Sequence, residues 1–340
     1  MPPRILYDGW PLTHASLGAA AAHLRELLAA APTEAELLLA LPGAISEPLP
    51  ARVQTLLATP RERGDWEQSR LQALAVEHGA TVIHTTARAA SLLGKVPTLA
   101  SPAEYAASPA ARGRMAAAQA SGGLARARLL WPSDLPAPAH SGVLNTLPPV
   151  AAPVTQAALP ANTPQEYLLY HGSGQPEALL PLLKAWTWAA GSIGELYPLL
   201  IAGLDAQQDA WLQSQLPIFD VQDYVQTIQP SPTELHALIQ SCTALIHPEP
   251  PPAWGSSLRQ ALAYGKAIVA LQEPLTETMA GSAAYLAPAG DTRSLGAAII
   301  TVVVEESVRA ALEQQAAQKS ARWTADAFEA ALKALYSELA

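Results

Sequence analysis

Short apolar runs alternate with stretches of helical spacing in the first 100 residues. A strand is predicted at Arg4–Asp8, and residues 17–30 have the spacing of a helix with leucines on one side. Further strands are predicted at 35–41, 81–84 and 96–100, and a further helix at 66–77. Strands that alternate with helices in this way predict a parallel sheet covered by helices on both faces.

The same alternation begins again after residues 132–164, which are dense in Pro, Ala and Ser, carry little charge and mark the clearest boundary in the chain. Strands are predicted beyond it at 167–170, 197–202, Val225–Ile228, Ala244–His247 and 267–271, and helices at 177–189, 208–215, 232–240 and 324–339. The two halves share the alternation of strands and helices but not their amino-acid sequence. We therefore expect two Rossmann-like domains and not a repeat array.

Composition fits two domains and argues against a membrane span. A chain of 340 residues is long enough for two domains with a core each. Half of the residues are apolar, yet no apolar stretch reaches the roughly 18 residues of a transmembrane helix. The first residues, MPPRILYDGW, carry no secretory signal pattern. We expect a cytoplasmic protein, with the inner face of the membrane as a further location.

The net charge of -9 argues against a nucleic-acid partner, whose phosphates call for a basic surface. The basic run Arg112, Arg114, Arg126 and Arg128 is typical of a solvated helix face, with peripheral contact to an anionic membrane as the alternative. The eight histidines and the single cysteine have no metal-ligand spacing, which argues against a metal site. Cys242 lies in the apolar context SCTALIH and is expected to be a buried, inert thiol.

Residues 248–270 carry the most chemistry in the chain. A proline-rich loop leads to Trp254 and Gly255, a short helical pattern follows, and the segment ends in an apolar strand. This order is how an α/β fold presents amides at a helix start to a phosphate. Ser256 and Ser257 then bind phosphate through their amides or serve as plain helix caps. Trp254 either stacks on a base or sugar or forms a packed wall of the loop.

The second half resembles the GT-B glycosyltransferases of family 4 (group 1), which transfer a sugar from a nucleotide-sugar with retention at the anomeric carbon. LLYHGSGQPE resembles the opening strand and turn of the family's C-terminal domain, and it contains His171, Gly172 and Ser173. WGSSLRQALAYGKAIVA is in register with the family's FGLPxLEAMAxGxPVVA, and TETMAGSAAYLAPAGD places Glu277 at the family's glutamate position.

The first half resembles the family more loosely. LGAAAAHLRELL is similar to the family's glycine-rich start GGvgryvreLl, with Gly18 kept and Ala19 in place of the second glycine. GATVIHTTA, which contains His84, resembles the family's strand aDvvHsp. Pro102 and Ala103 stand where the family has a His-Asp pair.

This resemblance implies an α/β fold of the GT-B type, with two Rossmann-like domains facing across a cleft. The expected divisions are 1–160 for an acceptor-side domain, 161–322 for a nucleotide-sugar domain, and 323–340 for a helix that crosses back onto the first domain. The implied donor-binding residues are Gly18, Gly172, Ser173, Trp254, Gly255, Ser256, Ser257, Gln260 and Glu277. His84 and His171, each at the end of a strand, are candidates for catalysis or phosphate contact, with a structural role as the alternative.

The chain departs from the family where charge is expected. In the Glu-x7-Glu motif the first carboxylate is replaced by Pro252 and the second, which the family places on the donor ribose, by Gln260. The cations that neutralise the diphosphate are missing at Ser173 and its neighbours. Fixed cations stabilise the charge that develops on a diphosphate leaving group, so their loss affects the transfer step directly. Gln260 can still hydrogen-bond a ribose hydroxyl.

Two functions therefore remain open, together with a remote third. One is a metal-independent, retaining transferase of envelope or polysaccharide glycans, which takes a nucleotide-sugar donor, a glycan or lipid-linked acceptor and no further cofactor. The other is a catalytically inactive relative that acts as a binding or scaffolding partner. An unrelated two-domain Rossmann-like enzyme is the third reading.

Overall fold

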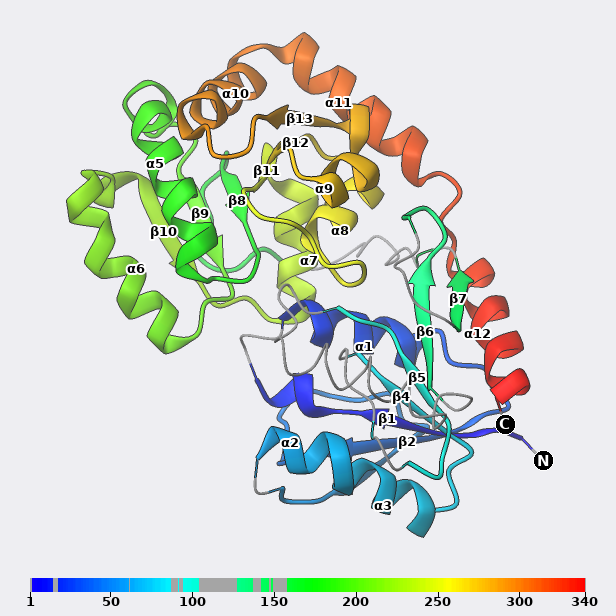
Figure 1. Cartoon of the computed structure of the whole chain (residues 1–340). Coiled ribbons are helices and arrows are strands. Elements are labelled where there is room, and N and C mark those ends of the chain that lie inside the picture. The colour runs from blue at the N-terminus through cyan, green and yellow to red at the C-terminus, as the bar shows by residue number, and fades with distance from the viewer. Residues whose placement is uncertain are drawn as a thin grey trace. The chain divides into compact units, whose positions relative to one another are not determined.

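The computed structural model describes residues 2–14, 18–60, 62–86, 91, 94–103, 127–136, 142–146, 148 and 158–339 (Figure 1). The chain divides into two compact units. The first unit comprises Met1–Pro149, Pro252–Gly255 and Trp323–Ala340, and the second comprises Val150–Pro251 and Ser256–Arg322. Of the basic run noted above, Arg112, Arg114 and Arg126 lie outside the described residues.

The first unit contains a seven-stranded sheet in the order β3-β2-β1-β4-β5-β6-β7, in which every described pairing is parallel. The strands are β1 (Arg4–Asp8), β2 (Glu36–Leu41), β3 (Val53–Leu57), β4 (Val82–Thr85), β5 (Thr98–Ala100), β6 (Ala127–Pro132) and β7 (Val143–Thr146). The helices are a 3-10 turn (Trp10–Thr13), α1 (Gly18–Ala29), α2 (Arg63–Asp65), a π turn (Trp66–Arg70), α3 (Leu71–Glu77) and α12 (Ala325–Leu339). β7 lies inside residues 132–164, so the segment that the composition marks as a boundary also contributes a strand to the first unit.

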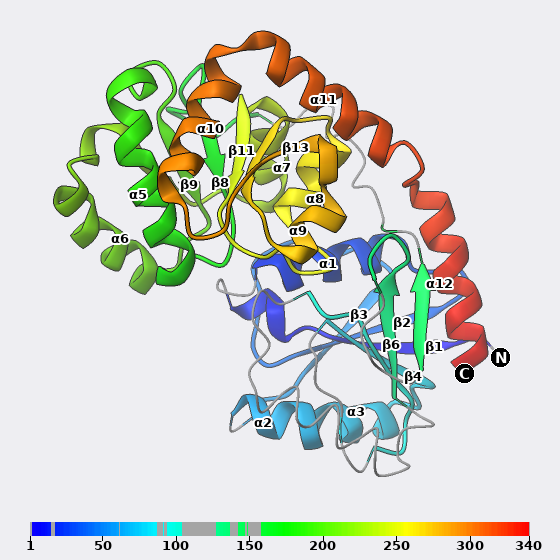
Figure 2. The same ribbon diagram turned by 45° about the horizontal axis from the view of Figure 1, so that its top comes forward.

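Helices cover both faces of this sheet, as the alternation predicts. Figures 1 and 2 show α1 and α3 on opposite faces. On one face, Leu6 and Ile83 pack with Trp66 and Leu71. Successive side chains of a strand point to opposite faces, so the buried neighbours of Leu6 in β1 pack on the other side.

The second unit contains a six-stranded sheet in the order β10-β9-β8-β11-β12-β13, again with every described pairing parallel. The strands are β8 (Leu168–Tyr170), β9 (Leu199–Ala202), β10 (Val225–Ile228), β11 (Ala244–His247), β12 (Ile268–Leu271) and β13 (Ala284–Ala287). The helices are α5 (Pro176–Ile193), α6 (Ala206–Phe219), α7 (Pro232–Ser241), α8 (Ser257–Ala263), α9 (Pro274–Met279), α10 (Thr292–Val304) and α11 (Glu306–Ser320), with 3-10 turns at Gln222–Tyr224 and Gly281–Ala283.

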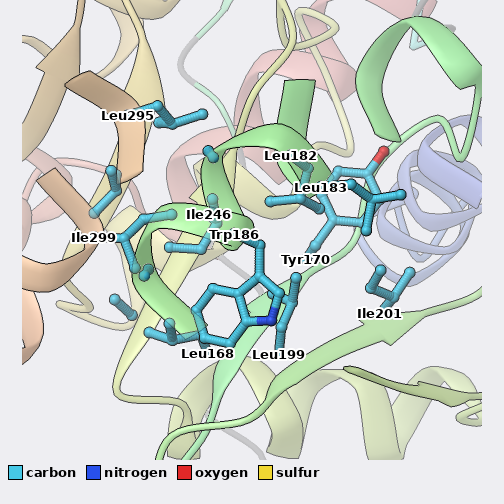
Figure 3. Close-up of a cluster of buried hydrophobic side chains, with 14 of the residues drawn as sticks. Leu168, Tyr170, Leu182, Leu183, Trp186, Leu199, Ile201, Ile246, Leu295 and Ile299 are labelled. Atoms are coloured by element: carbon cyan, nitrogen blue, oxygen red, sulfur yellow. The ribbon is translucent and has the colours of Figure 1, made fainter. Parts of the chain in front are cut away.

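The core of the second unit forms where α5 and α10 pack side by side on the sheet (Figure 2). Figure 3 shows Trp186 of α5 among apolar side chains of β8, β9 and α10. Gly296 of α10 lies so close to α5 that a β-carbon there would reach 2.6 Å from the Ala185 carbonyl oxygen. None of the described helices is long and apolar enough to cross a membrane.

Local sequence explains several helix starts in this unit. Asp205 and Gln208 form a reciprocal capping box at the start of α6, and Ser231 and Glu234 form another at α7. Each box satisfies backbone amides that the first helical turn leaves without partners. These helices therefore begin where the chain supplies a cap.

Candidate functional site

The strand order of the second unit places a switch point between β8 and β11. From β8 the chain runs outward through β9 and β10, and from β11 it runs the other way through β12 and β13. Ligands of open parallel sheets bind at the carboxyl ends of the strands at such a point. The loops that follow β8 and β11 are therefore the first place to search for a site.

A turn directly after β8, which we call the Ser173 turn (His171 to Gly174), binds a carboxylate of the same chain. Glu249, two residues after β11, accepts hydrogen bonds from the Ser173 amide at 2.9 Å and the Ser173 hydroxyl at 2.5 Å. The Tyr170 hydroxyl donates a third at 2.9 Å. The ring of Tyr170 lies in the apolar cluster of Figure 3, with its hydroxyl oxygen at the edge, so the core positions this donor.

Further contacts hold the Ser173 turn in place. The Gly174 amide donates to the Tyr170 hydroxyl at 3.1 Å, and the Gln208 side-chain amide donates to the Ser173 carbonyl at 2.9 Å. A β-carbon on Gly172 would overlap the Glu249 carboxylate as it is placed here, so the turn leaves room for that carboxylate because this position is a glycine. The turn is therefore built around the carboxylate.

His171 is neutral at physiological pH. Its Nδ1 hydrogen-bonds the hydroxyl of Ser257, the first residue of α8, and both side chains are buried. Burial lowers the pKa of His171 to about 4, with smaller effects from His247 and His236. His171 therefore supplies no positive charge near pH 7.

Ser256, the residue before α8, and Gln260 of α8 are also buried. Ser256 caps the helix, and its hydroxyl oxygen accepts from the Arg259 amide at 3.2 Å. The side chain of Gln260 is inside the protein, and its Oε1 has no hydrogen-bond partner among the described residues. The buried hydroxyl of Thr276 in α9 likewise has no hydrogen-bond partner among the described residues. No pattern in the sequence indicated Thr276.

Trp254 and Gly255 belong to the first unit. The Trp254 ring stacks on His23 of α1, with centroids 4.8 Å apart, and its indole N–H donates to the Leu130 carbonyl at 3.2 Å. The Trp254 side chain is completely buried, so its faces are used by packing. Gly255 has φ of 63°, and a β-carbon there would overlap the Ala19 carbonyl.

The remaining expected positions lie in three places. Gly18 opens α1, directly before the buried Ala19. Glu277 is exposed on α9 and accepts a hydrogen bond from the Gln272 side chain at 2.5 Å. Pro102 and Ala103 are buried after β5.

His84 lies inside the first unit, in a chain of buried polar side chains. Its Nδ1 is 2.6 Å from the Tyr336 hydroxyl of α12 and its Nε2 is 2.9 Å from the Ser101 hydroxyl. The Tyr336 hydroxyl is also 3.0 Å from that of Tyr7. Burial holds the pKa of His84 well below its usual range, so this side chain is neutral.

Two further observations concern reactive groups. Cys242 is buried, as expected, and burial raises the pKa of its thiol to about 12. Within the described ranges, no group of three or more His, Cys, Asp or Glu side chains is placed to hold a metal ion.

Glu249 and Tyr170 were missed by the sequence analysis, although a carboxylate just after a strand at the switch point was a usable signal.

Residues 155–319 match the family model described as glycosyl transferases group 1. No curated protein matches the chain in sequence. Solved structures match over nearly the whole length. WaaG, a glycosyltransferase involved in lipopolysaccharide biosynthesis, has a TM-score of 0.72 at 12% identity and covers 100% of this chain and 99% of its own. HepE from Anabaena, solved in complex with UDP and glucose, has a TM-score of 0.71 at 14% identity, with 99% of both chains covered.

A third similar structure is sucrose-phosphate synthase from Thermosynechococcus elongatus, with a TM-score of 0.70, 16% identity and 99% of both chains covered. At these identities the structural matches show the fold alone. The family model adds the sequence relationship over the second unit. The chain therefore has the GT-B fold, and its residues 155–319 match the model of the glycosyl transferases group 1 family.

Proposed function

We propose that this protein binds a nucleoside-diphosphate sugar and transfers the sugar, with retention at the anomeric carbon, to a glycan or lipid-linked acceptor in envelope or polysaccharide synthesis. The group 1 match over residues 155–319 supports transfer from a nucleotide-sugar. The likeness to HepE, solved with UDP and glucose, and to WaaG, involved in lipopolysaccharide biosynthesis, favours this donor class and this setting.

The observation that carries the proposal is Gln260. An amide oxygen that is buried without a partner costs about 1–3 kcal/mol, and a ligand hydroxyl removes that cost. Gln260 follows the switch-point loop after β11 and stands where the family places its ribose carboxylate. We propose that its Oε1 accepts a ribose hydroxyl of the donor.

The other proposed donor contacts come from residues around the switch point. Ser257 is oriented by neutral His171, so its hydroxyl is held in a defined direction. Ser256 contributes its backbone amide in place of a cation, whereas the Ser173 amide and hydroxyl already donate to Glu249. In this reading the second unit takes the nucleotide-sugar and the first unit takes the acceptor side. The reaction belongs in the cytoplasm or at the inner face of the membrane.

Calorimetric titration with UDP, UDP-glucose, GDP and ADP tests the donor proposal. We expect one nucleotide to bind, and Gln260→Ala to weaken it about threefold to tenfold through the lost hydrogen bond. Gln213→Ala, an exposed glutamine of α6, is the matched control and should bind as the unmodified protein does. Absence of binding by all four nucleotides at millimolar concentration would overturn the proposal.

A second candidate function is a catalytically inactive binding or scaffolding partner. It is favoured by the Glu249 carboxylate in the Ser173 turn and by Pro252 at a carboxylate position. UDP release from UDP-glucose, measured with and without membrane lipid extract, separates the two. Nucleotide-sugar binding without any UDP release under either condition favours the inactive partner.

A further inference from the structure

The Ser173 turn has the properties of an anion site with an occupant supplied by the chain. It follows a central parallel strand at the switch point and directly precedes α5, an 18-residue helix. One backbone amide and two hydroxyls converge on the two oxygens of Glu249 within 2.5–2.9 Å. These are the donors that a phosphate oxygen takes in such a turn.

Glu249 is held by hydrogen bonds and not by a counter-ion. None of the described lysine or arginine side chains forms an ion pair with Glu249, so the turn compensates the carboxylate through N–H and O–H donors. Gly172 leaves room for the Glu249 carboxylate because it has no side chain. The fit is therefore steric as well as electrostatic.

A second anion cannot share these donors with Glu249. Each donor proton is already directed at a carboxylate oxygen, and two negative charges a few ångströms apart repel strongly where no cation lies between them. A diphosphate at this switch point must therefore replace the carboxylate or bind away from the turn.

We propose that Glu249 occupies the position of a ligand phosphate in the Ser173 turn and excludes phosphate or diphosphate groups from it. The inference rests on the proposed nucleotide-sugar function and deepens it, because recognition then depends on the nucleoside and the sugar rather than on the diphosphate. Removal of the carboxylate creates a phosphate site in the turn. Glu249 therefore determines specificity by excluding negatively charged groups from the turn.

Binding of inorganic pyrophosphate, measured by calorimetry on the full chain, tests the vacated turn. We expect Glu249→Ala to bind pyrophosphate at least about tenfold more tightly than the unmodified protein, since two or three donors to a charged group become available. Glu195→Gln removes one negative charge at an exposed position of the same unit, so it controls for net charge and should leave the affinity unchanged. Equal pyrophosphate affinity in Glu249→Ala and Glu195→Gln would overturn the inference.

Glu249→Gln keeps the size of the side chain and removes only its charge, so it carries the test if the alanine variant does not fold. We expect a smaller gain in pyrophosphate affinity than for alanine, with circular dichroism and thermal unfolding as checks on folding. A glutamine variant that is folded and binds pyrophosphate no more tightly than the unmodified protein contradicts the exclusion.

Uridine and UDP separate this inference from the proposed function. If both hold, the unmodified protein binds the two with similar affinity, and Glu249→Ala prefers UDP by about tenfold or more. If the nucleotide function fails while the inference holds, Glu249→Ala gains pyrophosphate affinity and uridine binds neither protein. If the unmodified protein already prefers UDP and Glu249→Ala leaves that preference unchanged, the inference is wrong and the function stands.

Discussion

At the residue scale, His171 shows how burial changes the chemistry of a strand-end histidine. In an unfolded chain its imidazole has a pKa near 6.5, whereas in the folded protein burial lowers the pKa to about 4. Between these values the unfolded chain binds more protons than the folded one. The free energy of unfolding therefore rises with pH across this window and falls on acidification.

We predict that His171 contributes to acid sensitivity of the fold. Urea unfolding at pH 7, 6 and 5 should show a loss of up to about 1.4 kcal/mol per pH unit from this group below pH 6.5. His171→Asn keeps a polar side chain without a titratable ring, and its unfolding free energy should fall less steeply. His84 remains in both proteins as a common background. Parallel pH profiles for the two would contradict the prediction.

Gly255 illustrates a second constraint at this scale, because it combines a left-handed backbone with a close approach to Ala19. We predict that Gly255→Ala destabilises the protein more than a left-handed alanine alone, which costs about 1–2 kcal/mol. Gly290 has φ of 79° and open space around it, so Gly290→Ala is the matched control. Thermal and urea unfolding of both variants measure the difference. An equal loss of unfolding free energy in the two variants would show that the backbone around Ala19 moves to accommodate the added β-carbon.

At the element scale, α12 is joined to β1 and β4 by a buried polar contact. The Tyr336 hydroxyl lies between Tyr7 and His84, and all three side chains are fully buried. Burial also raises the pKa of Tyr336 well above its usual range, so the hydroxyl stays protonated and can donate. The contact therefore specifies how this helix packs within the first unit.

We predict that Tyr336→Phe lowers the free energy of unfolding by about 1–3 kcal/mol, because it leaves polar atoms of Tyr7 and His84 without this partner. Tyr285→Phe, on β13, removes a hydroxyl from a partly exposed ring and is the control. Urea unfolding gives the values, and hydrogen exchange of α12 amides should increase in the first variant alone. Unchanged stability of Tyr336→Phe would show that water or rearrangement replaces the hydroxyl.

Three of the elements that the sequence analysis missed, β3, β7 and α10, share a physical reason. The edge strand β3 buries only part of its side chains, and β7 follows a run rich in proline and alanine, so neither has a strong periodic signal. The helix α10 contains the run AAIITVVV, whose β-branched residues favour strands, yet it packs as a helix on α5. Tertiary packing decided these cases because local preference was weak or misleading.

At the scale of the whole molecule, the units are not continuous in sequence. Residues Pro252–Gly255 count with the first unit, although the expected domain bounds placed them within 161–322. The stack of Trp254 on His23 and the tight packing of Gly255 on Ala19 account for this assignment. A four-residue excursion of this kind has no signal in a linear pattern, since it depends on contacts between residues more than 200 positions apart.

The sequence by itself determined two parallel α/β units and the group 1 character of the second, because strand and helix periodicity, caps and turn glycines are properties of neighbouring residues. It also indicated residues 248–270 and the turn after β8 as candidate positions for a site. Only the tertiary structure decided that Glu249 lies in the Ser173 turn, 76 positions away, and that Gln260 Oε1 is buried without a partner among the described residues. The reason is that burial and hydrogen-bond partnership are set by which distant segments meet, and the order of residues along the chain does not specify this.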